Sequence, residues 1–163
     1  MLDAVAQLGG IHGFAAWNGH VLTDSGGYQV FSLQPKVDDD GATFRSTYDG
    51  SIHRLTPESA VTTQELLGAD IQMVLDVCPP LPSPPHVVEL AVKRTTEWAG
   101  RARRAHSRDD QALFGIVQGG IDAELRNVSA EIETALDRRD ERLASQTAIA
   151  WASRIEALRT GAI

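Results

Sequence analysis

Three polar residues, Asp24, Asp76 and Gln118, each end a short predicted strand and precede a loop that is rich in glycine or proline. In parallel α/β folds the carboxyl ends of the strands meet at one edge, where ligands bind and reactions take place. Carboxylates accept hydrogen bonds from ring and exocyclic N–H groups, and an amide can donate to a carbonyl oxygen. The three side chains together therefore suit a heterocycle that displays both donors and acceptors, as guanine-like bases do.

Each of these residues also has an interpretation that needs no ligand. Asp24 before a glycine pair is typical of a helix N-cap or an Asx turn. Gln118 before a glycine pair is typical of a strand-end amide bonded to backbone. Asp76 lies in an apolar stretch, where a buried carboxylate is costly without a partner. The spacing of the three residues alone leaves both interpretations open.

Neighbouring residues extend the candidate site. Tyr28 offers an aromatic face for stacking, and the glycine pairs Gly26–Gly27 and Gly119–Gly120 allow backbone amides to approach a ligand. Cys78 is interpreted as a small buried apolar residue rather than a nucleophile, because no histidine lies near it in the sequence. A phosphate cradle is not indicated, because neither GxxxxGK[ST] nor GxGxxG is present.

The elements that must position these residues alternate between strand and helix. Strands are predicted over residues 21–24, 70–77 and 112–118, and a hairpin over 42–55 is expected to turn at Asp49-Gly50 in a type I′ turn. Helices are predicted over 57–67, from 86 to about 106, and from 122 onwards. This order predicts a parallel sheet with crossover helices, as in a barrel or a doubly wound fold.

Capping residues and apolar periodicity define the predicted helices. Thr56 and Pro57 begin the first helix and Gly68 ends it, while Asp122 caps the third. The inner face of the second helix is Val88, Ala91, Thr95, Trp98, Ala99 and Ala102, and that of the third is Leu125, Val128, Ile132, Ala135 and Leu136. In the strand over 70–77, one face carries Ile71, Met73, Leu75 and Val77, and the other carries Val74 and Asp76.

The composition is that of an ordinary globular domain. The chain has 163 residues, of which 42% are hydrophobic and 23% charged, and one domain is the default expectation. No apolar stretch reaches the roughly 18 to 20 residues of a membrane helix, so we expect a cytoplasmic protein without a membrane partner. Cys78 is the single cysteine and the five histidines do not fall at metal-ligand spacing, so neither a disulfide nor a metal site is expected.

The net charge of −7 argues against a strong, self-sufficient nucleic-acid binder, because such proteins usually present positive surface to phosphates. The basic cluster Arg101, Arg103 and Arg104 has two interpretations. It can contact phosphate, or it can be a solvated helix end that complements the helix dipole.

Four strings, in order along the chain, resemble the bacterial-type tRNA-guanine transglycosylases, also called queuine tRNA-ribosyltransferases. They are Leu22-Thr23-Asp24-Ser25-Gly26-Gly27-Tyr28-Gln29-Val30-Phe31-Ser32-Leu33, the segment from Phe44-Arg45-Ser46 through Asp49-Gly50-Ser51 to Leu55-Thr56-Pro57-Glu58, the segment from Gly68-Ala69-Asp70-Ile71-Gln72-Met73 through Asp76, and Phe114-Gly115-Ile116-Val117-Gln118-Gly119-Gly120. The resemblance covers residues 8–137. It favours the ligand-binding interpretation of Asp24 and Gln118.

The resemblance implies a (β/α)8 barrel that exchanges a guanine in the tRNA anticodon for a modified deazaguanine. Asp24 is then the proton acceptor, and Tyr28 stacks on the base, while Asp76 and Gln118 bond its polar edge. The remaining implied substrate-binding residues are Ser25, Gly26, Gly27 and Gly119. Cys78 matches the residue of bacterial members, which favours 7-aminomethyl-7-deazaguanine as the incoming base in queuosine biosynthesis.

Departures from the family pattern imply a fragment. A (β/α)8 barrel takes about 200 to 250 residues or more, so we expect an incomplete barrel with a β-hairpin insertion over residues 1–137 and a divergent, Ala- and Arg-rich helical tail over 138–163. The family's first strand and helix, which precede the position of Leu8, are expected to be absent, and no segment after Asp137 resembles the family. Its nucleophilic aspartate and zinc site are therefore expected to be absent, and the abrupt loss of similarity suggests a degraded or frame-shifted copy.

Two functions follow from this pattern. The first is a transglycosylase, a transferase of tRNA processing, truncated and inactive alone, with tRNA and guanine or 7-deazaguanine as partners. The alternative is a non-catalytic purine-binding or interaction fragment, which forms a homo-oligomer or completes a barrel with a complementing fragment. No cofactor is expected in this chain.

Overall fold

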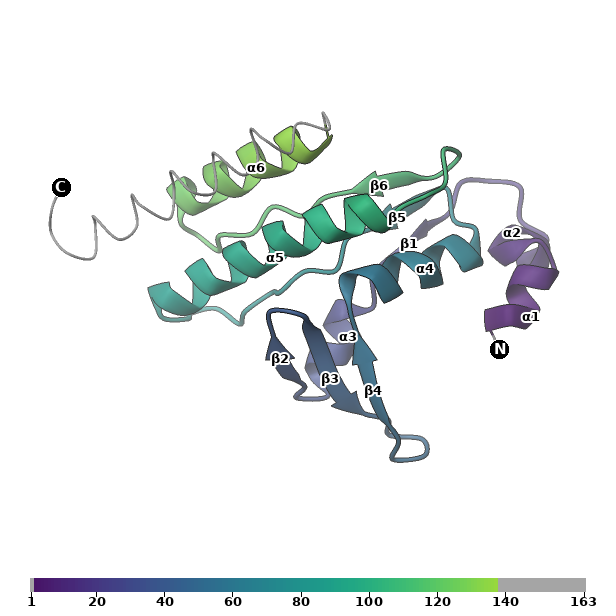
Figure 1. The fold of residues 1–163 in the computed structure, drawn as a ribbon, viewed down its shortest axis with the longest axis horizontal. Helices are drawn as coiled ribbons and strands as arrows, with labels where there is room; N and C mark the ends of the chain where they lie inside the picture. The colour runs from purple at the N-terminus through teal and green to yellow at the C-terminus, as the bar shows by residue number, and fades with distance from the viewer. Residues whose placement is uncertain (1, 138–163) are drawn as a thin grey trace, which may run out of the picture.

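The computed structural model describes residues 2–137, in which short strands alternate with longer helices (Figure 1). The helices are α1 (Leu2–Gln7), α2 (Gly10–Ala15), α3 (Gly27–Ser32), α4 (Pro57–Leu67), α5 (Pro85–Ala105) and α6 (Ala123–Asp137). The strands are β1 (Leu22–Thr23), β2 (Lys36–Asp38), β3 (Gly41–Arg45), β4 (Ile52–Leu55), β5 (Ile71–Met73) and β6 (Ala112–Phe114). The sequence patterns do not predict α1, α2, α3 or β2.

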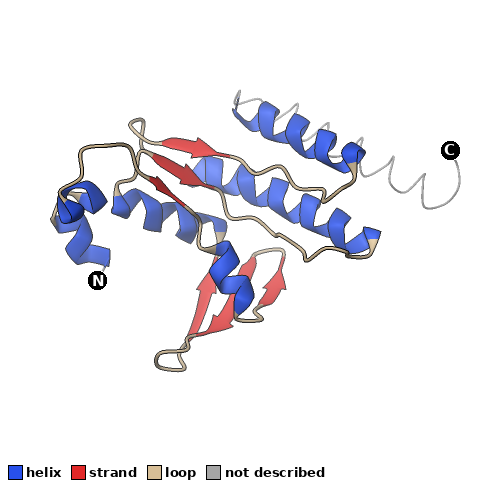
Figure 2. Ribbon diagram, turned by 180° about the vertical axis from the view of Figure 1, so that it is seen from behind, coloured by secondary structure: helices blue, strands red, loops and turns tan. Residues whose placement is uncertain are grey.

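A parallel sheet joins strands that are far apart in the chain. Its order is β1-β5-β6, with Leu22 opposite Ile71 and Ile71 opposite Ala112. Helices α4 and α5 lie on one face of this sheet, and the three strands are seen in front of them from the opposite side (Figure 2). The predicted mixed α/β fold, with a parallel sheet and crossover helices, is confirmed.

The regular strands are shorter than the apolar stretches predict. Strand β5 ends at Met73, although the Val74 N–H still donates to the Phe114 carbonyl at 3.0 Å. Val74 and Leu75 are then both buried, at 2% and 1% exposure. The predicted alternation of faces as far as Val77 is therefore wrong beyond Met73, because the chain leaves the pleat there.

Helix α4 begins and ends where its capping residues predict. The Thr56 hydroxyl accepts from the Ser59 N–H at 3.2 Å, and the Ser59 hydroxyl accepts from the Thr56 N–H at 2.9 Å. Pro57 occupies the first turn, and Gly68 ends the helix at a φ of 68°. Reciprocal bonds of this kind satisfy backbone donors that the helix itself cannot.

Replacing Thr56 by alanine is expected to lower the free energy of unfolding by about 1 kcal/mol, because the first turn loses its side-chain acceptor. Urea unfolding followed by circular dichroism measures the change. Thr62→Ala in the same helix is the control, since the exposed Thr62 hydroxyl bonds only the Glu58 carbonyl one turn earlier. Equal stability of the two variants would contradict the capping role.

The hydrophobic core lies between the parallel sheet and helices α4, α5 and α6. Its largest cluster contains Val61, Val74, Ala99, Ala102, Val128 and Ile132. The predicted inner faces of the second and third helices are confirmed for every position whose side chain is described. Ala135 and Leu136 fall outside that set. The helices therefore hold the sheet from one side.

The predicted hairpin is present as β3 and β4, but its turn differs from the prediction. Arg45 pairs with Ile52, so residues 46–51 form the loop, and Thr47 and Tyr48 belong to it rather than to a strand. A type I′ turn needs positive φ at both central residues, whereas only Gly50 has one here, at 72°. The Asp49 carboxylate instead accepts from the Ser51 N–H and hydroxyl at 3.1 and 2.7 Å.

A third strand, β2, completes the antiparallel sheet β2-β3-β4. Side chains of α5 form hydrogen bonds with the turn between β2 and β3. The Trp98 indole N–H donates to the Asp39 carbonyl at 2.7 Å, and Trp98 is fully buried. The Arg101 guanidinium bonds both Glu58 carboxylate oxygens, at 2.7 and 2.8 Å, and holds the pKa of that carboxyl down at about 2. Arg101 also donates to the Asp39 carbonyl at 3.2 Å, so it is paired within the fold and is not a purely solvated helix end, while phosphate contact by the basic cluster stays a prediction.

The amino-terminal helices α1 and α2 pack against α4. A Cβ at Gly10, whose φ is 74°, would lie 2.6 Å from the Leu67 carbonyl oxygen, so this close approach requires glycine. Within residues 2–137, no helix is both long and apolar enough to cross a bilayer. The predicted tail over 138–163 lies outside the described residues.

Candidate functional site

Asp24, Asp76 and Gln118, here named the polar edge, follow the ends of β1, β5 and β6. The Gln118 amide nitrogen donates to the Asp76 carboxylate at 2.6 Å. Asp24 lies close enough for its charge to raise the pKa of Asp76. The Gln118 side chain therefore bonds a carboxylate rather than backbone, so the expected backbone partner is wrong, and a role of Gln118 in ligand binding stays a prediction.

The Asp76 carboxyl has a raised pKa. Burial is the largest cause, and the negative charge of Asp24 adds to it, while the hydrogen bond from Gln118 lowers the pKa. A desolvated carboxylate with a second carboxylate beside it gains from any ligand that brings N–H donors. The polar edge is thus electrostatically prepared for a donor-rich ligand.

The turn after β1 shapes the Asp24 side of the polar edge. The Ser25 N–H donates to the Asp24 carboxylate at 2.7 Å, and the Gly27 N–H donates to the Ser25 hydroxyl at 3.3 Å. Gly26, at a φ of 81°, is the N-cap of α3, and as a glycine it has no side chain that could cap the helix. The N-cap interpretation of Asp24 is therefore wrong, and its second carboxylate oxygen accepts no protein hydrogen bond among the described residues.

Two of the glycines predicted to lie at the site are required by close packing of the surrounding chain. A Cβ at Gly27 would lie 3.1 Å from the Leu75 side chain, so this glycine lets the β1–α3 turn approach the end of β5. Gly119 has a φ of 128°, and a Cβ there would lie 2.7 Å from the Arg126 backbone nitrogen. Gly119 thus allows the close approach of α6, and its contact with a base stays a prediction.

Tyr28 and Cys78 are both accessible. Tyr28 lies in the first turn of α3 and is 77% exposed, which leaves its ring free to stack. Cys78 is exposed, so the expectation of a buried cysteine is wrong. Residue 78 lies in the loop that leads to the prolines, and its side chain is accessible there.

Three buried polar side chains lie near the polar edge, and the sequence patterns do not identify them as site residues. Gln64, Thr95 and Ser129 are 2%, 0% and 0% exposed and bond the segments that carry the polar edge. A polar residue within the apolar stripe of a helix is the only signal of them in the sequence, and Thr95 is there predicted simply as part of the inner face.

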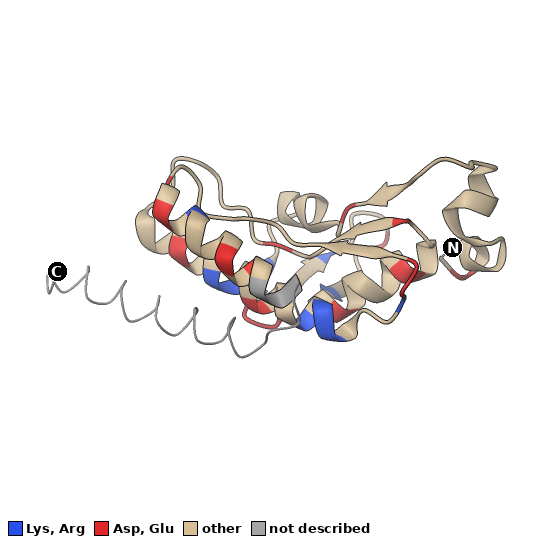
Figure 3. Ribbon diagram, turned by 90° about the horizontal axis from the view of Figure 1, so that it is seen from above, with Lys and Arg blue, Asp and Glu red and all other residues tan. Residues whose placement is uncertain are grey.

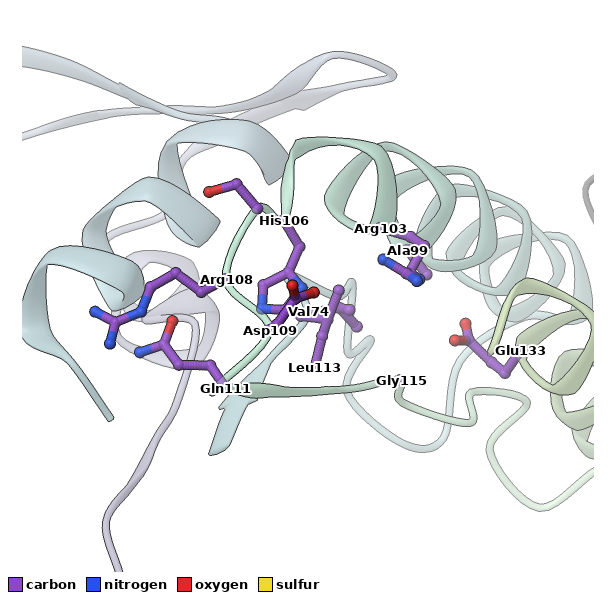
Figure 4. Close-up of a pocket in the computed structure, with 11 residues that line it drawn as sticks. Val74, Ala99, Arg103, His106, Arg108, Asp109, Gln111, Leu113, Gly115 and Glu133 are labelled. Atoms are coloured by element: carbon purple, nitrogen blue, oxygen red, sulfur yellow. The ribbon is translucent and has the colours of Figure 1, made fainter. Parts of the chain in front are cut away.

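A separate cavity of about 260 Å³ lies between the carboxyl end of α5, strand β6 and helix α6. Glu133 and Arg103 both line it (Figure 4). Burial raises the pKa of Glu133 to about 8. Because none of the polar-edge residues lines this cavity, it is not the candidate ligand site.

Charge and metal ligands add no second site in the described part of the chain. Acidic and basic residues are interspersed along the helices (Figure 3). No group of three or more His, Cys, Asp or Glu side chains within residues 2–137 is placed to hold a metal ion. The donor set of this part therefore does not fit the zinc ion that the family resemblance implies, and the absence of a cofactor from the whole chain stays a prediction.

Comparison with known proteins gives consistent matches. The family model described as Queuine tRNA-ribosyltransferase matches residues 1–143, which extends beyond both ends of the resemblance over 8–137. The match therefore includes residues 1–7, and it includes residues 138–143, contrary to the expectation that no segment after Asp137 resembles the family. The expected absence of the family's first strand and helix stays a prediction.

Individual relatives carry the same name. The Queuine tRNA-ribosyltransferase of Herpetosiphon aurantiacus is 55% identical over 130 residues, which cover 78% of this chain and 33% of the relative. That of Gloeobacter violaceus is 54% identical over 137 residues, covering 83% and 36%. That of Thermus thermophilus is 51% identical over 129 residues, covering 78% and 34%. The chain thus spans about a third of the length of the curated relatives it matches, and on the strength of the family match it belongs to the queuine tRNA-ribosyltransferase family.

Proposed function

We propose that this chain supplies the base-binding edge of a tRNA-guanine transglycosylase that exchanges anticodon guanine for 7-aminomethyl-7-deazaguanine. Within this proposal the parallel sheet β1-β5-β6 is part of a (β/α)8 barrel, and the antiparallel sheet is an insertion into it. The observation that carries the proposal is the contact of Asp76 with Gln118 beside Asp24, in a chain of this family.

Guanine presents one carbonyl acceptor next to two N–H donors. An ionised Asp76 accepts from the ring N–H and the exocyclic amine, while the Gln118 amide nitrogen donates to the carbonyl oxygen. The bond between Asp76 and Gln118 at 2.6 Å holds the two groups side by side before a base arrives. Adenine reverses this donor and acceptor pattern, so the same pair selects against it.

Base exchange also requires movement of a proton. As the incoming base forms its bond to the ribose C1′, the bond from C1′ to the family's nucleophilic carboxylate breaks, and the base nitrogen that makes the new bond loses its proton. We assign Asp24 as the acceptor, because one of its carboxylate oxygens bonds the Ser25 N–H and the other has no hydrogen-bond partner among the described residues. Tyr28 stacks on the base, and Ser25, Gly26 and Gly27 form the wall next to Asp24.

The nucleophile, the tRNA contacts and the zinc site of the family are not assigned to residues of this chain. Because the chain spans about a third of its relatives, it is expected to bind the base without catalysing exchange alone. This coverage also favours the second candidate function, a non-catalytic purine-binding fragment that pairs with another copy or with a complementing fragment.

Isothermal titration of the monodisperse protein with guanine, 7-aminomethyl-7-deazaguanine and adenine tests the proposal. We expect heats of binding for the first two bases and none for adenine. A labelled-guanine incorporation assay with tRNA then separates the two functions, because incorporation requires the complete reaction. A folded sample that binds neither guanine nor its deaza analogue would overturn the proposal.

A further inference from the structure

The strand end that carries Asp24 is held by a side chain of α4. The Gln64 amide oxygen accepts from the Thr23 hydroxyl at 2.9 Å and from the Met73 N–H at 3.1 Å. Its amide nitrogen donates to the Met73 carbonyl at 2.9 Å and to the Ala60 carbonyl at 3.2 Å. Every donor and acceptor of this buried amide is used. Gln64 therefore fixes β1 and β5 at one distance, directly before Asp24.

The other two strand ends are held in the same way by the next two helices. From α5, the Thr95 hydroxyl accepts from the Val77 N–H at 2.9 Å, one residue after Asp76. From α6, the Ser129 hydroxyl accepts from the Gln118 N–H at 3.1 Å. Both hydroxyls are fully buried. Gln64, Thr95 and Ser129 are here named the helix anchors.

The position of the helix anchors differs from that of ordinary capping or turn residues. Each helix anchor bonds residues at the end of a strand or just after it, where the hydrogen bonds between neighbouring strands no longer fix the backbone. Apolar contacts between helix and sheet are not directional, whereas hydrogen bonds depend on distance and angle. Loss of a buried acceptor leaves an N–H without a partner, so the segment must move toward water to satisfy it.

We propose that the helix anchors are positioning residues, which set the spacing within the polar edge and thereby its fit to a guanine-like base. The choice of ligand rests on the proposed function, while the spacing of the polar edge does not. Each anchor acts through a backbone or side-chain group next to the polar edge and does not itself touch the base.

Two adjacent threonines of α5 provide a matched test. Thr95→Val removes the acceptor for the Val77 N–H while keeping the shape of the side chain. Thr96→Val is the control, because the Thr96 hydroxyl is also buried but donates only to the Val92 and Lys93 carbonyls of its own helix. Both variants place the same residue at neighbouring buried positions, so general effects of the substitution are shared.

Two readouts are measured on each folded variant, namely the pKa of the Asp76 carboxyl by carbon-13 NMR and the guanine affinity by titration. In Thr95→Val we expect the Asp76 pKa to fall toward its usual range, since water reaches the carboxyl, and the guanine affinity to drop about tenfold. Thr96→Val is expected to change neither, and Thr95→Ser to retain the parent values because it keeps the hydroxyl.

The outcomes separate the two proposals. A folded Thr95→Val variant with the parent Asp76 pKa and guanine affinity would overturn the positioning role. If the parent binds no guanine, the proposed function fails, but the Asp76 pKa still decides whether the anchor positions the edge. Should Thr95→Val not fold, Thr23→Val severs one bond and leaves Gln64 bonded to Met73. We expect the same two changes there, and parent values for both would likewise overturn the inference.

Discussion

Asp76→Asn is expected to weaken guanine binding by about 100-fold or more. The substitution replaces a double acceptor by an amide that presents a donor to a donor-rich edge of the base, and it removes the charge that strengthens both hydrogen bonds. Sites built to hydrogen-bond a ligand reject a mismatched partner strongly, because buried polar groups are then left unpaired. Isothermal titration with guanine measures the loss.

The same carboxyl predicts how base binding depends on pH. Burial holds the Asp76 pKa above its usual value, and only the ionised form accepts two hydrogen bonds. Guanine affinity should therefore be full above the raised pKa and fall as the pH drops through it. Titrations of the parent protein over a series of pH values test this dependence, which the Asp76→Asn variant should lack.

Unfolding does not account for the expected loss of binding. An acid whose pKa is raised by folding holds its proton more tightly in the folded state, so ionisation of Asp76 lowers stability as the pH rises above the usual carboxyl pKa. Asp76→Asn removes this penalty and is expected to be at least as stable at neutral pH. Asp49→Asn in the exposed hairpin loop is the control and should bind guanine like the parent. If Asp76→Asn bound guanine as tightly as Asp49→Asn does, Asp76 would be excluded from the base-binding site.

The parallel arrangement and the polar edge could be predicted from the sequence because the signals are local. Thr56, Pro57 and Gly68 mark the ends of α4 through their own backbone preferences. Asp76 and Gln118 end apolar stretches, and parallel topology alone then brings them to one edge. Neither inference needs knowledge of long-range contacts.

The features that the sequence could not predict depend on tertiary contacts. Strand β5 ends at Met73 because Leu75 turns into the cluster with Ala60 and Trp98. The bond from Thr95 to Val77 requires knowledge of which face of α5 meets which residue of the loop. From the sequence alone, a threonine within an apolar stripe is interpreted as a core residue, because the contacts between α5 and the loop after β5 are not known.

Glu133→Gln is expected to stabilise the protein by about 2 to 4 kcal/mol above pH 8 and to have little effect near pH 4. Burial alone raises the pKa of Glu133 to about 8, from a usual value of 4.5. One of its carboxylate oxygens is buried without a hydrogen-bond partner among the described residues. Each unit of pKa shift corresponds to about 1.4 kcal/mol, and relaxation of the site reduces the full amount.

The sign of this effect follows from proton binding. Between pH 4.5 and about 8 the unfolded chain has lost the Glu133 proton while the folded protein retains it, so the free energy of unfolding falls as the pH rises through this window. Glutamine carries no titratable proton, and the variant should lose that part of the pH dependence.

Urea unfolding of the parent and of Glu133→Gln at pH 4, 6 and 8.5 measures the difference, which should grow at each step. Glu131→Gln is the control, because Glu131 lies on the same helix with an exposed side chain. A difference between Glu133→Gln and the parent that is the same at all three pH values would mean that Glu133 titrates as it does in the unfolded chain. In that case α6 would not bury the carboxyl against the cavity behind β6, and the packing that places Ser129 beside Gln118 would also need revision.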